Sequence, residues 1–182
     1  MSSNPKACWG GRALLFGGLV LVTGCGQRQT PALPPRPQPA TVARTIALDP
    51  PVYVAISGSG ALFAVRASGL AETRASSTAL RRFASQILRN QIAIGAQLNF
   101  AGRRIDGLPS SRLQPRHQVM LDQLASSTNF DSTYKRQIGI ILRDCVHHHR
   151  AFEASGASPT LRTVARFAAS LCEKDVEALV ML

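Results

Sequence analysis

Residues 129–153, with the sequence NFDSTYKRQIGIILRDCVHHHRAFE, decide the fold because they combine a helix start, a long apolar stripe and the only clustered histidines. Asn129 or Asp131 can cap the free amides at the beginning. Apolar residues then recur at spacings of three and four, which is typical of one face of an amphipathic helix. That face carries Tyr134, Ile138, Ile141, Leu142, Cys145, His148 or His149, and Phe152. The stretch predicts one long helix that stops at Gly156.

The same periodicity predicts three more long helices and a short one. Ser57-Gly58-Ser59-Gly60 weakens the first half of the first helix and moves its expected start towards Gly60. The last helix starts with Ser158 as its N-cap and Pro159 at its first position. The expected ranges are 52–75, 79–102, 116–125 and 159–182. Four long helices, with the short one in the longer connection, indicate an all-α four-helix bundle.

The N-terminus has the parts of a bacterial lipoprotein signal. Basic residues come first, residues 13–22 form an apolar run too short to span a bilayer permanently, and small residues then lead to Cys25. We expect residues 1–24 to be removed and Cys25 to carry acyl chains such as palmitate. Gly26 stands where, in many enteric bacteria, an aspartate directs retention at the inner membrane. The expected location is the periplasmic face of the outer membrane, with the inner membrane as the alternative.

Residues 25–51 contain the lipidated cysteine and a proline-rich segment with seven of the eleven prolines. Such a segment favours extended conformations and does not pack a core. We expect a semi-rigid tether, with a ligand for a proline-binding protein as the alternative. The folded domain is then expected to cover residues 52–182.

The chain is strongly basic. Its net charge is +11, and removal of the leader with Lys6 and Arg12 leaves +9. In the envelope, positive charge suits anionic lipid, lipopolysaccharide or peptidoglycan carboxylates. An exported protein has little access to nucleic acid, and the arginines are not interleaved with aromatic residues, so nucleic-acid binding is not expected.

Cys145 and Cys172 are the two thiols left after loss of Cys8 and lipidation of Cys25. They lie on the core stripes of the last two helices, at similar distances from the turn between them, in an oxidising compartment. We expect a disulfide between them, with two buried free thiols as the alternative. The chain has no Cys-x-x-Cys motif, which argues against a catalytic pair.

The three consecutive histidines at 147–149 cannot all bind one ion, because adjacent helix residues point about 100° apart. A spacing of four instead pairs Cys145 with His149 and Asp144 with His148. Candidate ligands for zinc, copper or iron are Cys145, His148, His149, Asp175 and Gln91, the last two because they lie on the apolar stripes of other helices. We favour instead a group of surface histidines at the end of a helix, where they meet its negative dipole.

The sequence over residues 52–181 resembles a known family. The resemblance is carried by residues 60–71, Leu80-Arg-Arg-Phe-Ala84, Phe130-Asp131 with Tyr134, and the closing helix from Leu161 to Asp175. These are similar to the ferritin-like domain-of-unknown-function family 4142, whose members are described as predicted outer membrane proteins. The resemblance implies a ferritin-like bundle and an envelope location, and it implies no established chemistry.

Members of that family commonly carry glutamate, aspartate and histidine residues that face into the bundle. The corresponding positions here are Phe63, Asn90-Gln91, Leu142 and Asp175, so most of the potential ligands are missing. We therefore expect no catalytic residue and no cofactor, and a non-enzymatic structural or binding role in the cell envelope. The alternative is a metal-binding or redox protein with a degenerate site. Oligomeric state and specific ligand stay open.

Overall fold

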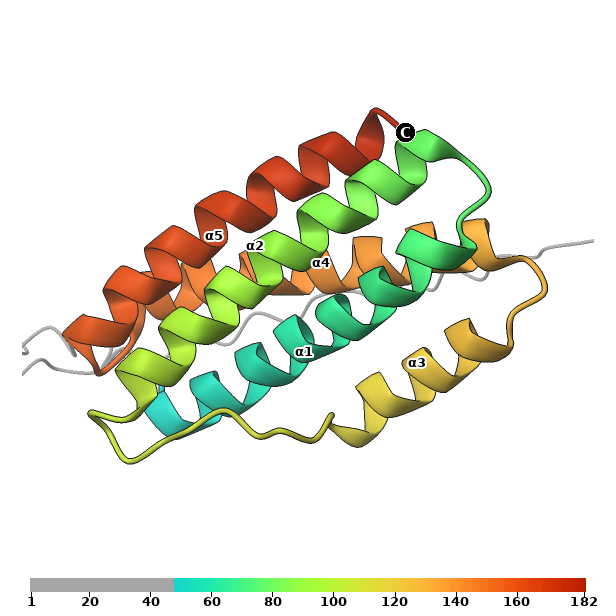
Figure 1. Cartoon of the computed structure of the whole chain (residues 1–182). Helices are drawn as coiled ribbons and strands as arrows, with labels where there is room; N and C mark the ends of the chain where they lie inside the picture. The colour runs from blue at the N-terminus through green and yellow to red at the C-terminus, as the bar shows by residue number, and fades with distance from the viewer. Residues whose placement is uncertain (1–47) are drawn as a thin grey trace, which may run out of the picture. The chain divides into compact units, whose positions relative to one another are not determined.

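Helices form almost all of the part of the protein that the computed structural model describes, which is residues 48–182 (Figure 1). The expected signal peptide, Cys25 and nearly all of the expected tether lie outside these described residues. The helices are α1 (Pro50–Arg74), α2 (Thr78–Gly102), α3 (Pro115–Ser126), α4 (Phe130–Ser155) and α5 (Pro159–Val180). The prediction of an all-α bundle with a short extra helix is confirmed.

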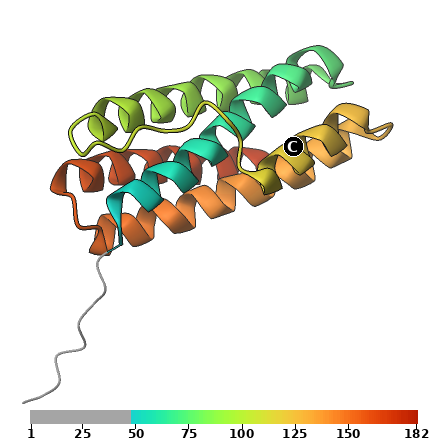
Figure 2. The same ribbon diagram turned by 90° about the horizontal axis from the view of Figure 1, so that it is seen from below.

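The four long helices run antiparallel to their neighbours. The pairs α1–α2 and α4–α5 are hairpins with short turns, while α3 lies in the long connection and packs outside the bundle against α1 and α4 (Figure 2). Serine hydroxyls cap the N-termini of two helices. The side chain of Ser77 accepts a hydrogen bond from Leu80 N at the start of α2, and that of Ser158 accepts one from Leu161 N at the start of α5.

Apolar side chains fill the bundle from end to end in two clusters. The first lies towards the α1–α2 turn and includes Phe63, Leu80, Phe83, Ile87, Leu124, Tyr134, Ile138 and Leu142. The second lies towards the α4–α5 turn and includes Tyr53, Ile94, Leu98, Phe152, Leu161 and Cys172. By length and composition α1 could cross a membrane, but half of its most apolar 18-residue window is buried within the bundle, as in a core helix.

The start of α4 differs from the expectation. Asn129 is the N-cap residue, yet its side chain makes no capping hydrogen bond. Asp131 does not cap α4 either, because its carboxylate accepts hydrogen bonds from the backbone N and the hydroxyl of Ser76. The carboxylate thereby ties the α1–α2 turn to the beginning of α4.

The start of α1 also differs, because the helix begins at Pro50 and runs through the Ser-Gly-Ser-Gly stretch. The reason is tertiary. The connection between α2 and α3 packs so closely on this stretch that a Cβ added at Gly58 would lie 2.8 Å from Pro109 Cβ. Ser59 Oγ accepts a hydrogen bond from Gln114 N at 2.8 Å. Small residues are needed here for close approach, and the packing outweighs their low helix propensity.

In the structure, a disulfide joins Cys145 of α4 to Cys172 of α5, with 6.3 Å between the Cα atoms. The bond lies in the middle of both helices and links the two members of the α4–α5 hairpin. A covalent link of this kind restricts the unfolded chain and so stabilises the fold.

Two glycines of the same stretch should respond in opposite ways to alanine. A Cβ at Gly60 would meet no atom within 4 Å, whereas one at Gly58 would collide with Pro109. Gly60→Ala should raise the free energy of unfolding by about 0.5 to 1 kcal/mol through helix propensity. Gly58→Ala should lower it by about 1 kcal/mol or more through overpacking. Denaturant unfolding of the two variants measures both effects, and equal stabilisation would contradict the tight contact at Pro109.

Candidate functional site

A small cavity opens between the first half of α1, the start of α3 and the second half of α4. Its volume is about 70 Å³. The helices contribute a mixed lining of Ile56, Ser57, Gly60, Ala61, Gln91, Gln114, Arg116, His117, Ile141, Asp144, Cys145, His148 and His149. Three imidazoles from two helices therefore border one space, which we call the histidine cavity.

His117 reaches the histidine cavity from the first turn of α3. It is 6% exposed, and its Nδ1 lies 2.7 Å from Ser59 Oγ of α1. Among the described residues, its Nε2 has no hydrogen-bond partner. Burial and then Arg116 lower the pKa of His117, while Asp144 opposes the shift. The ring is therefore neutral near pH 7 and held in one orientation by α1.

His149 lies in the second half of α4 and, like His117, is buried beside the histidine cavity. It is 2% exposed, and its Nδ1 lies 2.7 Å from the hydroxyl of Tyr53. The ring of Tyr53 also stacks on Phe152, with 3.8 Å between centroids. Burial, with a smaller contribution from His148, lowers the pKa of His149 to about 4. This histidine is a neutral core residue, which corrects the expectation that the whole cluster lies on the surface.

Charged groups lie at the mouth of the histidine cavity. Arg116 and Asp144 form an ion pair at 3.1 Å, and both side chains are partly exposed. His148 is half-buried beside them; burial lowers its pKa, and Asp144 opposes that shift. Ser57, which also lines the cavity, is 8% exposed, and its Oγ has no hydrogen-bond partner among the described residues. The cavity therefore has mixed polar and apolar walls and a charged rim.

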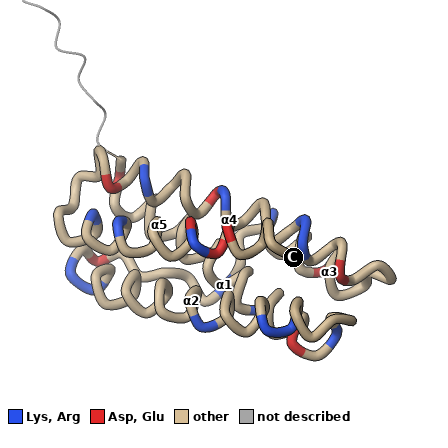
Figure 3. The backbone as a smooth tube through the Cα atoms, turned by 90° about the horizontal axis from the view of Figure 1, so that it is seen from above, with Lys and Arg blue, Asp and Glu red and all other residues tan. Residues whose placement is uncertain are grey.

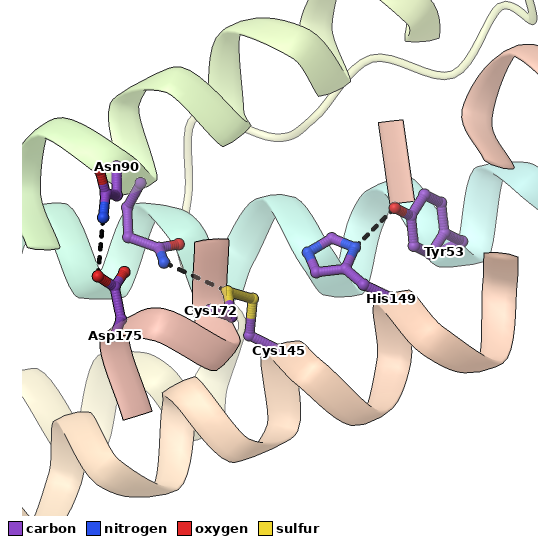
Figure 4. The surroundings of a disulfide bond; sticks show 7 residues. Tyr53, Asn90, Cys145, His149, Cys172 and Asp175 are labelled. Carbon is purple, nitrogen blue, oxygen red and sulfur yellow. Dashed lines mark hydrogen bonds between the residues drawn. A yellow bond between two sulfur atoms is a disulfide. The ribbon is translucent and has the colours of Figure 1, made fainter. Parts of the chain in front are cut away.

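The disulfide separates the histidine cavity from a second buried polar group, the carboxylate of Asp175 (Figure 4). Asp175 is fully buried, and its Oδ1 accepts hydrogen bonds from Asn90 Nδ2 at 2.7 Å and Gln86 Nε2 at 3.1 Å. Burial raises the pKa of this carboxyl, and the two amides oppose the shift. Gln91 Nε2 lies 3.6 Å from Cys172 Sγ, so this amide packs on the disulfide.

The structure brings together only part of the predicted metal-binding set. Cys145, His148, His149 and Gln91 all line the histidine cavity, but Asp175 does not. Cys145 is bonded to Cys172, so no thiolate is available there as a ligand. Within residues 48–182, no three side chains of His, Cys, Asp or Glu are placed to hold a metal ion.

His117 was not among the site residues predicted from the sequence. The residue stands alone in the first turn of a short helix, away from the other histidines, and nothing in its local pattern indicates burial. A weak signal was present in Pro115, which marks the start of α3 and so places residue 117 in its first turn. Its contact with Ser59, 58 residues away, arises only from the tertiary fold.

The buried histidines should make the protein less stable in acid. The folded pKa of His149 is about 4 and its unfolded value about 6.5, so the unfolded state binds more protons between these values. The contribution of neutral, buried His149 to the free energy of unfolding is fully present above pH 6.5 and is lost as the pH falls towards 4. Between pH 7 and 5, the free energy of unfolding should drop by about 2 kcal/mol on account of His149. The raised pKa of Asp175 acts in the opposite direction.

Urea unfolding of the wild type and His149→Gln over this pH range checks the expectation. The variant should show a flatter dependence on pH. His147→Gln serves as the matched control, because His147 is exposed and lies only two residues from His149 in the sequence. If His149→Gln and His147→Gln both keep the wild-type slope, His149 is not the group that is buried in its neutral form.

Comparisons with known proteins show what the chain is similar to. No curated protein matches the sequence. A solved structure described as "CopM in the Cu(II)-bound form" aligns with a TM-score of 0.64 at 15% identity, covering 75% of this chain and 96% of that chain. At this identity the likeness concerns the fold alone. A family model described as "Domain of unknown function (DUF4142)" matches residues 35–181, which is well over half of the chain. The chain therefore belongs to the DUF4142 family, as its sequence motifs indicated.

Proposed function

We propose that this protein is a non-enzymatic component of the bacterial cell envelope, with a structural or binding role. It is held on the periplasmic face of the outer membrane by acyl chains on Cys25. The apolar run and small residues before Cys25, and the proline-rich segment after it, support this location. A disulfide in the bundle is compatible with an oxidising compartment.

One observation carries the non-enzymatic proposal, namely the side chains at the family's inward-facing positions. Phe63 and Leu142 are fully buried there and offer no donor atom. Asp175 is held by amides of Asn90 and Gln86, and Gln91 packs on the disulfide. A di-iron site of the ferritin type needs carboxylates and imidazoles that converge from all four helices. The bundle interior is instead filled by core packing and amide hydrogen bonds.

The size of the histidine cavity supports the same proposal. Pockets that enclose small-molecule substrates usually measure roughly 300 to 1,000 Å³. The histidine cavity, at about 70 Å³, has room for an ion or a few water molecules. A role in binding a larger molecule would therefore use the outer surface of the bundle.

Lipid attachment can be tested in cells with an alkyne analogue of palmitate. We expect label on the wild-type chain and on Cys8→Ser, but not on Cys25→Ser, because only a cysteine at the processed N-terminus is acylated. Cys25→Ser should also leave the outer-membrane fraction. Label that persists on Cys25→Ser, or a wild-type chain found free in the periplasm, would contradict the proposed anchor.

A second candidate function is the reversible binding of a transition metal ion in the histidine cavity. Two buried imidazoles have Nδ1 held by hydroxyls of α1 and Nε2 without a partner among the described residues, an arrangement that orients histidine ligands. The fold neighbour CopM was solved in a Cu(II)-bound form. The ion, as bound cargo, would be held by no more than two of the imidazoles that line the cavity, which are those of His117, His148 and His149. Because no three donors converge, this set fits only weak, exchangeable binding.

Elemental mass spectrometry of the purified full chain separates the two candidates. We expect a metal content well below one ion per chain, because the cavity is not a closed metal centre. A content near one copper or zinc per chain would favour the second function, provided that His117→Gln with His148→Gln abolishes it. His147→Gln is the control, since His147 does not line the histidine cavity. Metal lost equally in the control would indicate adventitious binding to the exposed cluster.

A further inference from the structure

We propose that the outward face of α2 lies on a membrane surface that carries anionic headgroups. This α2 face consists of Arg82, Arg89, Ile92, Ala96, Phe100 and Arg103, which recur at spacings of three, four and seven. Helical periodicity places all six on one side of the helix, opposite the buried stripe that contains Ile87, Ile94 and Leu98. The inference rests on the proposed envelope location, because it requires a membrane near the domain.

The centre of the α2 face is apolar and uncovered by the rest of the described chain. Ile92 is 51% exposed and Phe100 is 59% exposed. Between them, Gly95 and Ala96 leave a shallow groove, and a Cβ added at Gly95 would meet no atom within 4 Å. Two large exposed apolar side chains two turns apart on one helix are a feature of helices that lie in a membrane interface.

The charge on this face has one sign. Residues 78–105 contain five arginines and neither aspartate nor glutamate (Figure 3). None of the four ion pairs found among residues 48–182 involves an arginine of α2. Arg104, just beyond the helix, stacks on Phe100 with its guanidinium 4.8 Å from the ring centroid. Arg116, Arg150 and Arg166, on α3, α4 and α5, have acidic partners, whereas α2 carries no acidic residue at all, so positive charge on this face is not offset within the helix.

This combination matches a lipid surface. Guanidinium groups form charge-assisted hydrogen bonds to phosphate oxygens, and basic residues near an anionic leaflet are attracted to it. Ile92 and Phe100 lie between the arginines, where they can enter the boundary between headgroups and acyl chains. A partner that is only acidic would satisfy the arginines but would leave these apolar side chains unmatched, whereas an anionic lipid surface matches both. We therefore assign the α2 face to anionic lipid.

Tryptophan quenching on vesicles tests which face touches the membrane. In the full chain with Trp9→Phe as background, one tryptophan probe is placed by Phe100→Trp and, in a second protein, by Val119→Trp. Val119 is a matched control because it is 54% exposed and lies on α3, which packs against α1 and α4. The vesicles contain brominated phosphatidylglycerol with phosphatidylethanolamine, or brominated phosphatidylcholine alone. Circular dichroism checks that each variant keeps its helices.

We expect strong quenching of the probe at position 100 on phosphatidylglycerol vesicles and little at position 119. On phosphatidylcholine, position 100 should lose most of its quenching. Arg89→Glu with Arg103→Glu should weaken vesicle binding by roughly tenfold or more, since both charges are reversed. Arg136→Glu with Arg143→Glu, on the exposed face of α4, makes the same change in net charge and should have a much smaller effect.

Equal quenching at the two positions, or an equal loss of binding in the two charge variants, would overturn the assignment of the α2 face. Quenching that is as strong on phosphatidylcholine would show that headgroup charge plays no part, and would overturn it as well. These outcomes are separate from failure of the proposed anchor, because the vesicle experiment does not depend on acylation of Cys25 in the cell. The cellular labelling in turn says nothing about which face of the bundle is in contact.

Discussion

Buried hydroxyl groups on α1 determine how the rest of the bundle is arranged around it. Tyr53 pairs with His149, Ser59 with His117, and Ser68 with Tyr134, each at 2.7 to 2.9 Å. A buried polar group that loses its partner costs about 1 to 3 kcal/mol. A shift of α1 by one turn along α4 would break two such pairs while leaving apolar contact possible. The hydrogen bonds therefore specify the register that hydrophobic packing alone leaves loose.

The same small residues of α1 explain why the histidine cavity exists and why it is modest. Gly58 allows the connection before α3 to approach closely. The hydroxyl of Ser59 forms hydrogen bonds both with Gln114 N of that connection and with His117 Nδ1. Ser57 and Gly60, which line the cavity, leave space that larger side chains would fill. The result is a small space with mixed polar and apolar walls, which include imidazoles and one end of the disulfide. Such a space suits an ion or water better than a substrate, which agrees with the proposed binding role of the outer surface.

The distribution of charge supports that view of the surface. Acidic residues on α4 and α5 are engaged by arginines, as in the network of Arg150 with Glu153 and Glu173 and of Arg166 with Glu153. Among the five helices, α2 therefore has the most positive net charge, because it carries no acidic residue. Under the proposed membrane contact, this basic and apolar face would set the orientation of the bundle.

The sequence by itself determined the elements of this protein, whereas the tertiary structure decided its site. Spacings of three and four, the capping serines and the prolines predicted all five helices, and every boundary except the start of α1 to within a few residues, because these signals act locally. The start of α1 could not be predicted, because close approach of Pro109 and Gln114 holds the Ser-Gly-Ser-Gly stretch in a helix. The cluster at 147–149 was visible in sequence, but its division into exposed His147, half-buried His148 and buried His149 depends on how α4 packs against α1. His117 lines the cavity because of contacts with residues distant in the chain, such as Ser59. Long-range contacts of this kind leave no periodic signal in a sequence.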